Sequence, residues 1–357
     1  MDFDSGLLEA ARLVAFDPRS WEQKKEEVKP ITTPIALISV KKEEPKEVPK
    51  PAINKVESTQ PTQPPIQQAK QEVSESKYKK QLIDSANHYW YNLRLKIKAI
   101  SEDKSKKNVL DKIVTEINIV IQQFSSEADI DRSVPKIKSI LKELISQYDL
   151  YIYCIDYLIK CLLIKSEKYL NEDKKNYITF AKLITQLSKD NVLIRNYFLH
   201  MIAYKCPYIV PKIFSDKEYP DEKIRRKRLG FSDTSTENER LIDFLNNMEC
   251  YSYLYFNFLL QSNLTEIIKD YTNSLQTVTI THPIGSVFKV FLYILGSKVK
   301  ELEGMQKLTD IFTRMTKTLE DIKNKTTQGD IKSVLSANIR LMKKYHLNLK
   351  DNKKIDS

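Results

Sequence analysis

The chain has 357 residues, of which 41% are apolar and 29% are charged, and its formal net charge is +11. This apolar content supports a sizeable core, divided over one large domain or two ordinary ones. The most apolar window, residues 241–260, contains Asp243 and Glu249 and falls short of the roughly 20 nearly uncharged residues of a membrane span. The composition therefore excludes a membrane-spanning protein, and the positive surplus favours polyanionic partners.

The first 80 residues add almost nothing to this surplus, because they hold fourteen basic and thirteen acidic residues. Within residues 1–23, a short apolar pattern runs from Leu7 to Phe16, and we interpret it as an amphipathic helical docking segment. Residues 24–77 contain eight of the fourteen prolines and no aromatic residue. Such a composition buries too little apolar surface to offset chain entropy, so we expect a disordered linker.

From residue 78 onward the apolar residues recur at helical spacing, and we expect an α-helical scaffold domain over residues 78–350. Pro135 is expected to begin a helix, because proline suits the first helical turn. Residues 150–170 are apolar nearly all round, which is typical of a helix enclosed by others at the centre of a domain. Two further helices precede a bend at Cys206, over residues 177–187 and 192–202.

The C-terminal half continues the helical pattern. Residues 241–259 form an aromatic-rich helix whose tyrosines and phenylalanines are more typical of a core than of a surface that stacks RNA bases. An apolar helix begins at His282, and later segments are expected around Val299, over 311–322 and over 331–345. About a dozen helices with short turns predict an all-α, irregular helical-repeat (HEAT-like) scaffold with a disordered N-terminal tether. No clean sequence period is present.

Catalytic motifs are absent from the sequence. We find no phosphate-cradling glycine loop, no H-E-x-x-H and no G-x-S-x-G, and the six glycines leave few places for such a loop. The four cysteines and four histidines lack the spacing of metal ligands, so we expect no metal site. The acidic start Met1-Asp2-Phe3-Asp4 differs from a secretory leader, which predicts a cytosolic or nuclear protein with reduced cysteines. We therefore predict a non-enzymatic protein that acts through a binding surface.

One candidate surface is a basic run that consists of Arg225, Arg226, Lys227 and Arg228. Consecutive cations of this kind can bind phosphates, and arginine can do so with two parallel hydrogen bonds. In the alternative interpretation, the run is a solvated face that balances the acidic residues just upstream. The run alone leaves both interpretations open.

Two isolated lysines are further candidates. Lys160 stands inside the most apolar helix, where a lysine is costly unless its ammonium group reaches solvent or an anion. The alternative is an ion pair with Asp156, four residues earlier on the same helix face. Lys205 precedes the bend at Cys206, and its alternative is a capping role at a helix end, where the helix dipole favours a cation.

Several short elements, taken in order, resemble the C-terminal domain of the mRNA export factor Gle-one. The elements are Trp90 to Ile100, Gln122-Gln123-Phe124-Ser125, Lys205-Cys206-Pro207-Tyr208 with Val210-Pro211, Leu229-Gly230-Phe231 and His282-Pro283-x-Gly285. The resemblance extends over about residues 89–345. It implies a helical-repeat scaffold, related to the middle domain of the large translation-initiation scaffold factor and lacking catalysis of its own.

The resemblance also implies a function. Members of this family bind a DEAD-box RNA helicase of the mRNA export pathway at the cytoplasmic face of the nuclear pore, and they are also present in the cytoplasm. They hold the two RecA-like lobes of the helicase apart and promote RNA release. The implied partners are therefore this helicase, nucleoporins, and RNA indirectly, without a membrane. In fungal members, inositol hexakisphosphate lies between cationic faces of the two proteins.

The resemblance assigns ligand-contacting roles to Lys160 and Lys205. The fungal pattern has further cations where this chain has Met201 and Tyr204, and another near Val114. The candidates to restore this charge are Lys112, Lys165, Arg225, Arg226, Lys227 and Arg228. The prediction depends on these distant cations converging on one electropositive cleft in the folded chain.

Two rival functions remain open at the level of the sequence. The first is a generic RNA-binding helical scaffold, whose affinity for RNA would come from phosphate contacts and fall steeply with salt. The second is a translation or tethering adaptor that uses the same fold, because one fold hosts many functions.

Overall fold

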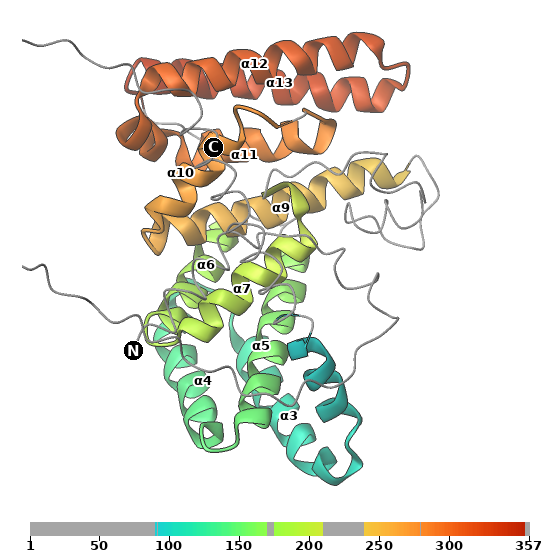
Figure 1. The fold of residues 1–357 in the computed structure, drawn as a ribbon, viewed down its shortest axis with the longest axis vertical. Coiled ribbons are helices and arrows are strands. Elements are labelled where there is room, and N and C mark those ends of the chain that lie inside the picture. Colours follow the sequence, from blue (N-terminus) through green and yellow to red (C-terminus); the bar gives the residue numbers. More distant parts are fainter. Residues whose placement is uncertain (1–89, 91, 170–174, 210–238, 279, 354–357) are drawn as a thin grey trace, which may run out of the picture.

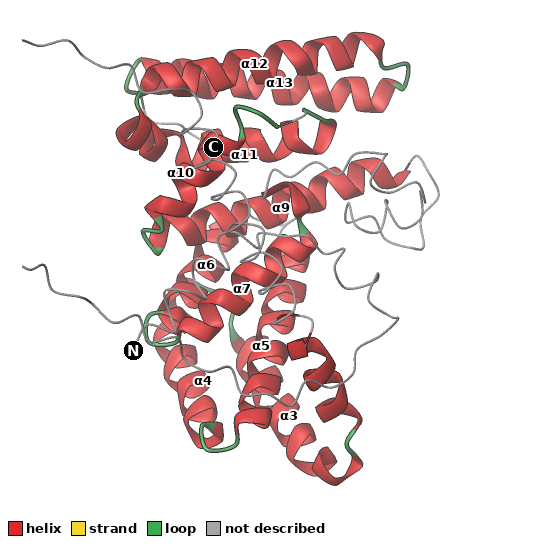
Figure 2. Cartoon of the chain, viewed as in Figure 1, coloured by secondary structure: helices red, strands yellow, loops and turns green. Residues whose placement is uncertain are grey.

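The computed structural model describes residues 90, 92–169, 175–209, 239–278 and 280–353. Every regular element in these ranges is helical (Figure 2), which confirms the all-α prediction. The predicted docking segment 1–23, the predicted linker 24–77 and the basic run Arg225 to Arg228 lie outside the described residues. Within the described ranges, none of the helices combines the length and the apolar composition that a membrane crossing requires.

The first half of the described chain is built around helix α5. Residues 92–102 are helical, and the following elements are η2 (Lys104–Lys106), α3 (Lys107–Gln123), η3 (Glu127–Asp129), α4 (Ile130–Leu144), α5 (Tyr148–Tyr169), α6 (Lys175–Ser188), α7 (Val192–Lys205) and η4 (Pro207–Ile209). Helix α5 contacts α3, α4, α6 and α7, and its residues Ile155, Leu158 and Ile159 are fully buried. The central position predicted for this apolar segment is therefore confirmed.

Helix α9 joins the two halves of the molecule. The second half consists of α9 (Glu239–Gln261), α10 (Thr265–Ser274), α11 (His282–Glu303), α12 (Met305–Lys325) and α13 (Gly329–Lys350). Figure 1 shows α9 crossing the middle of the structure, and this helix contacts both α6 and α11. Its residues Tyr251, Phe256 and Phe258 are buried, so the aromatic residues of this segment belong to the core, as predicted.

Two expected boundaries are wrong. Helix α4 begins at Ile130, five residues before Pro135, and continues directly from the 3₁₀ turn η3, whose capping box is formed by Ser126 and Asp129. The Asp129 carboxylate accepts hydrogen bonds from the backbone N–H groups of Ser125 and Ser126, both at 3.0 Å. These backbone bonds lower the pKa of Asp129 to about 2. The proline lies inside the helix, where it removes one backbone donor from an element that has already begun.

The second wrong boundary concerns Val299, which belongs to α11 and not to a separate segment. Val299 is fully buried, and the helix continues until Gly304, whose φ of 85° lies in the left-handed region that favours glycine. Two other glycines allow close packing of α11. A Cβ added at Gly285 would lie 2.8 Å from Leu319 of α12, and one at Gly296 would lie 2.6 Å from Leu349 of α13.

Candidate functional site

The described candidate lysines come from three neighbouring helices. Lys112 lies on α3, Lys160 and Lys165 lie on α5, and Lys205 is the last residue of α7. Helix α5 contacts both α3 and α7, so the fold does bring these segments together. Whether the basic run Arg225 to Arg228 joins them stays a prediction, since the run is outside the described residues.

Hydrogen bonds between the three helices fix their relative direction. The Tyr157 hydroxyl donates to Asn118 Oδ1 at 3.1 Å, and further along both helices the Lys165 ammonium group donates to the Gln122 carbonyl at 3.0 Å. On the other side of α5, Asn191 Nδ2 donates to the Tyr151 hydroxyl at 2.6 Å, and the Tyr197 hydroxyl donates to Asp156. Between α3 and α5, and likewise between α7 and α5, the residue numbers of the bonded partners rise together. Helices α3 and α7 therefore run parallel to α5.

This register determines which lysines lie at the same level. Lys205 follows Tyr197 by eight residues and Lys165 follows Asp156 by nine, so both lysines lie near one end of the three-helix group. Lys160 is just over one turn below Lys165 on α5. Lys112 precedes Asn118 by six residues on α3. It therefore lies about 9 Å from Asn118 along the helix axis, toward the opposite end of the three-helix group.

Lys160 is paired within the protein. Its Nζ lies 2.6 Å from Asp156 Oδ2, and the other carboxylate oxygen of Asp156 accepts the Tyr197 hydroxyl. The Asp156 side chain is only 6% exposed, whereas the Lys160 side chain is 45% exposed. The ion-pair alternative predicted from the sequence is therefore present, yet the ammonium group remains accessible to a ligand. A single lysine paired with a carboxylate presents little net charge to a distant polyanion.

Lys165 has a structural contact that the sequence did not predict. Its ammonium group donates to the carbonyls of Ile121 and Gln122 in the last turn of α3. Burial lowers the pKa of Lys165 below its ordinary value of 10.5. A cation at the carbonyl end of a helix stabilises the helix dipole and the unpaired carbonyls there. These contacts favour a capping role, and a role of Lys165 in polyphosphate binding stays a prediction.

Lys112 and Lys205 differ in their surroundings. The Lys112 side chain is 69% exposed, and its Nζ lies 3.7 Å from Glu116 one turn later on α3. This spacing gives a weak, solvent-screened ion pair. Lys205 is half-buried in the last turn of α7, at the carbonyl end of the helix where a cation is favourable.

The positions where the family pattern has additional cations are occupied differently. Met201 is 4% exposed and belongs to the core, so this position cannot present a charge to solvent. The Tyr204 ring lies beneath the guanidinium group of Arg94, whose Cζ is 4.8 Å from the ring centroid. Arg94 therefore brings a cation to the position next to Lys205, and a contact of this kind is favourable electrostatically.

Our sequence reasoning missed Arg94 as a candidate. It lies one helical turn after Trp90, whose ring stacks on His200 with the centroids 4.2 Å apart. Burial, and then the charge of Arg94, hold the pKa of His200 well below 6.5, so this imidazole is neutral near pH 7. The signal in the sequence was the spacing of Trp90 and Arg94, which places both side chains on one helix face.

Two of the described thiols, Cys154 and Cys206, are unsuited to nucleophilic catalysis. Burial raises the pKa of Cys154 and of Cys206 to about 12 in each case, and Cys206 Sγ lies 3.7 Å from the Met248 carbonyl. Buried thiols with raised pKa values are inert. Among the residues that the structure describes, no group of three or more His, Cys, Asp or Glu is arranged to hold a metal ion.

The fold defines an all-α scaffold of stacked helices, and the described candidate lysines lie on α3, α5 and α7. The chain belongs to the GLE1-like protein family, whose model matches residues 65–307. A search among curated proteins finds no matching sequence.

Two solved structures have a similar fold. Both are S. cerevisiae complexes of a variant Dbp5 C-terminal domain with Gle1 and IP6, and in one of them Gle1 also carries a substitution. In each, the match has a TM-score of 0.55 and 13% sequence identity, and it covers 76% of this chain and 96% of the other. At this identity the comparison establishes the fold.

Proposed function

We propose that this chain is a non-catalytic mRNA export factor that binds and activates a DEAD-box RNA helicase at the cytoplasmic face of the nuclear pore. The observation that carries the proposal is the GLE1-like family match, which spans residues 65–307 and thus most of the helical part. The fold likeness to chains in complexes titled with Dbp5, Gle1 and IP6 supports it.

The proposed mechanism is a shift in a conformational equilibrium. A helicase of this class alternates between a closed, RNA-bound state and an open state. A scaffold that binds the open state more tightly than the closed state favours opening by the difference between its two binding free energies. A rigid all-α body suits this task, because it can hold two lobes apart without deforming.

An inositol polyphosphate, with inositol hexakisphosphate as the candidate, would bridge the two proteins at the end of the α3, α5 and α7 group. Lys160, Lys205 and Arg94 are the described cations that we propose as its first contacts. Lys112, Lys165 and the run Arg225 to Arg228 remain candidates for a wider site. Because Asp156 neutralises Lys160, we expect weaker polyphosphate binding than in relatives with more unpaired cations.

The proposal is tested by measuring ATP hydrolysis by the export helicase of the same organism with RNA, with and without this chain. We expect stimulation by the chain, and further stimulation when inositol hexakisphosphate is added. Equal turnover with and without the chain would contradict helicase activation. Direct retention of RNA that falls steeply with salt and needs no helicase would instead favour the RNA-binding alternative.

The polyphosphate site is tested separately by the double variant Lys160→Asp and Lys205→Asp. Calorimetric titration with inositol hexakisphosphate should give a dissociation constant at least about tenfold weaker than that of the unchanged chain. The matched control is Lys136→Asp with Lys142→Asp, two exposed lysines of α4. Equal losses in both double variants would mean that only the overall charge attracts the ligand.

We further propose that residues 78–350 form the scaffold domain and that residues 24–77 tether the segment 1–23, which docks on a nucleoporin. The support is the composition of these segments. Deleting residues 1–77 should leave ATPase stimulation in solution intact and reduce recruitment to the nuclear pore, as measured by microscopy of a tagged chain. Loss of the stimulation itself would contradict this division of roles.

A further inference from the structure

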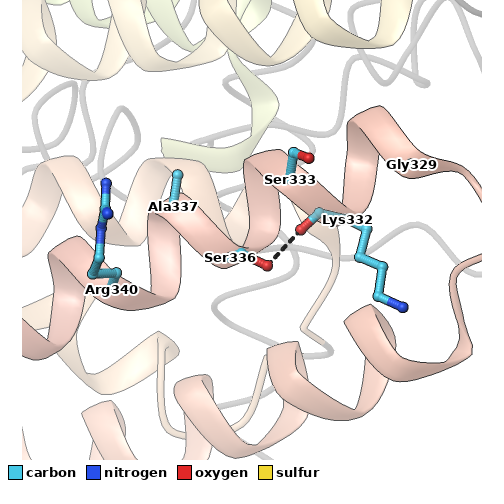
Figure 3. Close-up of a pocket in the computed structure, with 6 residues that line it drawn as sticks. All are labelled: Gly329, Lys332, Ser333, Ser336, Ala337 and Arg340. Atoms are coloured by element: carbon cyan, nitrogen blue, oxygen red, sulfur yellow. Dashed lines mark hydrogen bonds between the residues drawn. The ribbon is translucent and has the colours of Figure 1, made fainter.

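The outward face of α13 carries a groove with an unusual set of side chains. The groove has a volume of about 410 Å³ and is lined by Gly329, Lys332, Ser333, Ser336, Ala337 and Arg340. Figure 3 shows these residues along one helix, with Lys332 and Arg340 near the two ends and the small side chains between them. The only hydrogen bond drawn among them joins Ser336 Oγ to the Lys332 carbonyl at 2.7 Å, within the helix.

The charge of this face is one-sided. Helix α13 contains five Lys or Arg residues and a single acidic residue, Asp330 in its first turn. Lys343 is paired with Glu320 of α12 at 2.7 Å. Lys332, Arg340 and Lys344 are exposed, and none of them makes an ion pair with any residue that the structure describes.

The spacing of these three cations matches an elongated ligand. Successive residues of a helix rise by about 1.5 Å, so Lys332, Arg340 and Lys344 span about 18 Å along the axis. Ser333, Ser336 and Ala337 are too small to fill the space between Lys332 and Arg340. Leu347, whose exposed fraction is 56%, lies about one turn beyond Lys344 and adds an apolar contact point.

We propose that this face of α13 is a docking groove for an acidic segment of a partner protein. Carboxylates on the segment would meet Lys332, Arg340 and Lys344, and its backbone would approach the helix over the small residues. An apolar side chain of the segment would cover Leu347. Partners with complementary charge associate faster and in a defined register.

A protein segment fits this groove better than single-stranded RNA does. Binding of single strands relies on aromatic side chains on which bases stack. The exposed positions of α13 from Gly329 to Leu347 contain no aromatic residue. The groove also lies away from the α3, α5 and α7 group (Figure 1), so a partner bound there leaves the proposed polyphosphate site accessible.

The test uses the full chain and a fluorescein-labelled helical peptide with Glu at every fourth position on one face and Leu beside it. Its affinity is compared by fluorescence anisotropy with that of the same peptide carrying Gln in place of Glu. The double variant Lys332→Glu and Arg340→Glu should bind the Glu peptide at least about tenfold more weakly. The control, Lys136→Glu with Lys142→Glu on α4, makes the same change in net charge and should lose less than about threefold.

A second variant tests the shape of the groove independently of its charge. Ser336→Trp places a large ring between the cations and should weaken the Glu peptide by about fivefold or more, because it blocks close approach. Three results would overturn the proposal: equal losses in the groove and control double variants, full affinity in Ser336→Trp, or tighter binding of a uridine-rich RNA than of the peptide. Thermal unfolding is the control for folding: each variant should have the same midpoint temperature as the unchanged chain.

Discussion

The two cationic regions of this molecule, around α5 and on α13, differ in whether their cations already have partners within the protein. Around α5, Lys160 is paired with Asp156, and Lys165 donates to the end of α3. On α13, Lys332 and Arg340 are exposed and pair with no described residue. A positive charge is therefore a poor guide to a ligand site by itself, because a cation already bonded to protein oxygens has less to offer a ligand.

The largest expected effect concerns a buried cation, which needs a counterion because it is shielded from water. Lys289 of α11 is 10% exposed at its side chain, pairs with Glu249 of α9 and donates to Asn338 Oδ1 at 2.9 Å. Glu249→Ala should lower the free energy of unfolding by about 3 kcal/mol or more, because it leaves a buried charge without its counterion. Urea denaturation measures the change.

The double variant Glu249→Ala with Lys289→Met is the control for this prediction. Removing both charges should cost less than removing Glu249 alone, since no unpaired charge then remains in the core. A double variant less stable than the single one would show that the packing of these side chains, rather than the charge pair, is what stabilises this part.

The next largest effect concerns Asp156 on α5, the carboxylate that pairs with Lys160. Asp156→Ala should cost about 2 kcal/mol in urea denaturation, because the Tyr197 hydroxyl, in a side chain only 1% exposed, loses its acceptor. Asp156→Asn keeps an acceptor for that hydroxyl and removes only the negative charge. This variant should therefore bind inositol hexakisphosphate about fivefold more tightly. Unchanged affinity would mean that Lys160 makes no contact with the ligand.

Acid should affect the two halves unequally. His200 is buried against Trp90 with its pKa held well below 6.5, whereas His346 stacks on Phe312 in a more accessible position with its pKa lowered mainly by burial. A histidine whose pKa is depressed by folding binds its proton in the unfolded state first, so stability is present above pH 6.5 and declines as the pH falls below it. Each such group contributes a slope of up to about 1.4 kcal/mol per pH unit.

Two phenylalanine variants separate these contributions. His200→Phe preserves an aromatic ring against Trp90 and should remove most of the loss of stability between pH 6.5 and 5. His346→Phe should remove less, because that imidazole is more accessible. Urea denaturation at both pH values measures each slope, and an unaltered slope in His200→Phe would contradict the assignment.

The sequence predicted the helical class well, and the reasons are physical. Apolar periodicity depends on burial, so residues 150–170 and the aromatic helix around Phe256 were placed in the core correctly. The start of α4 was misplaced because the capped 3₁₀ turn η3 leads directly into this helix, so the helix has already begun when the chain reaches Pro135. The continuation of α11 through Val299 was missed because the residue that ends this helix is Gly304.

The candidate site was less predictable, since partners of a cation are set by tertiary contacts. The pairing of Lys160 with Asp156 is local and was predicted as an alternative, but the contact of Lys165 with the carbonyls of α3 joins residues more than 40 positions apart. Arg94 and Tyr204, whose side chains are in contact, are still further apart in the sequence. On α13, only the fold shows which cations lack a counterion among the described residues.

The smallest expected effect tests the α13 side directly. Lys332→Ala and Arg340→Ala should each change the free energy of unfolding by less than about 0.5 kcal/mol, because both side chains are exposed and unpaired among the described residues. Urea denaturation of the two variants checks this. A loss of more than 1 kcal/mol, by the same measure, would reveal a structural partner for these cations and remove the contrast with α5. Near-neutral stability, combined with the loss of acidic-peptide binding in the glutamate variants, would instead separate a surface built for a partner from cations that stabilise the fold.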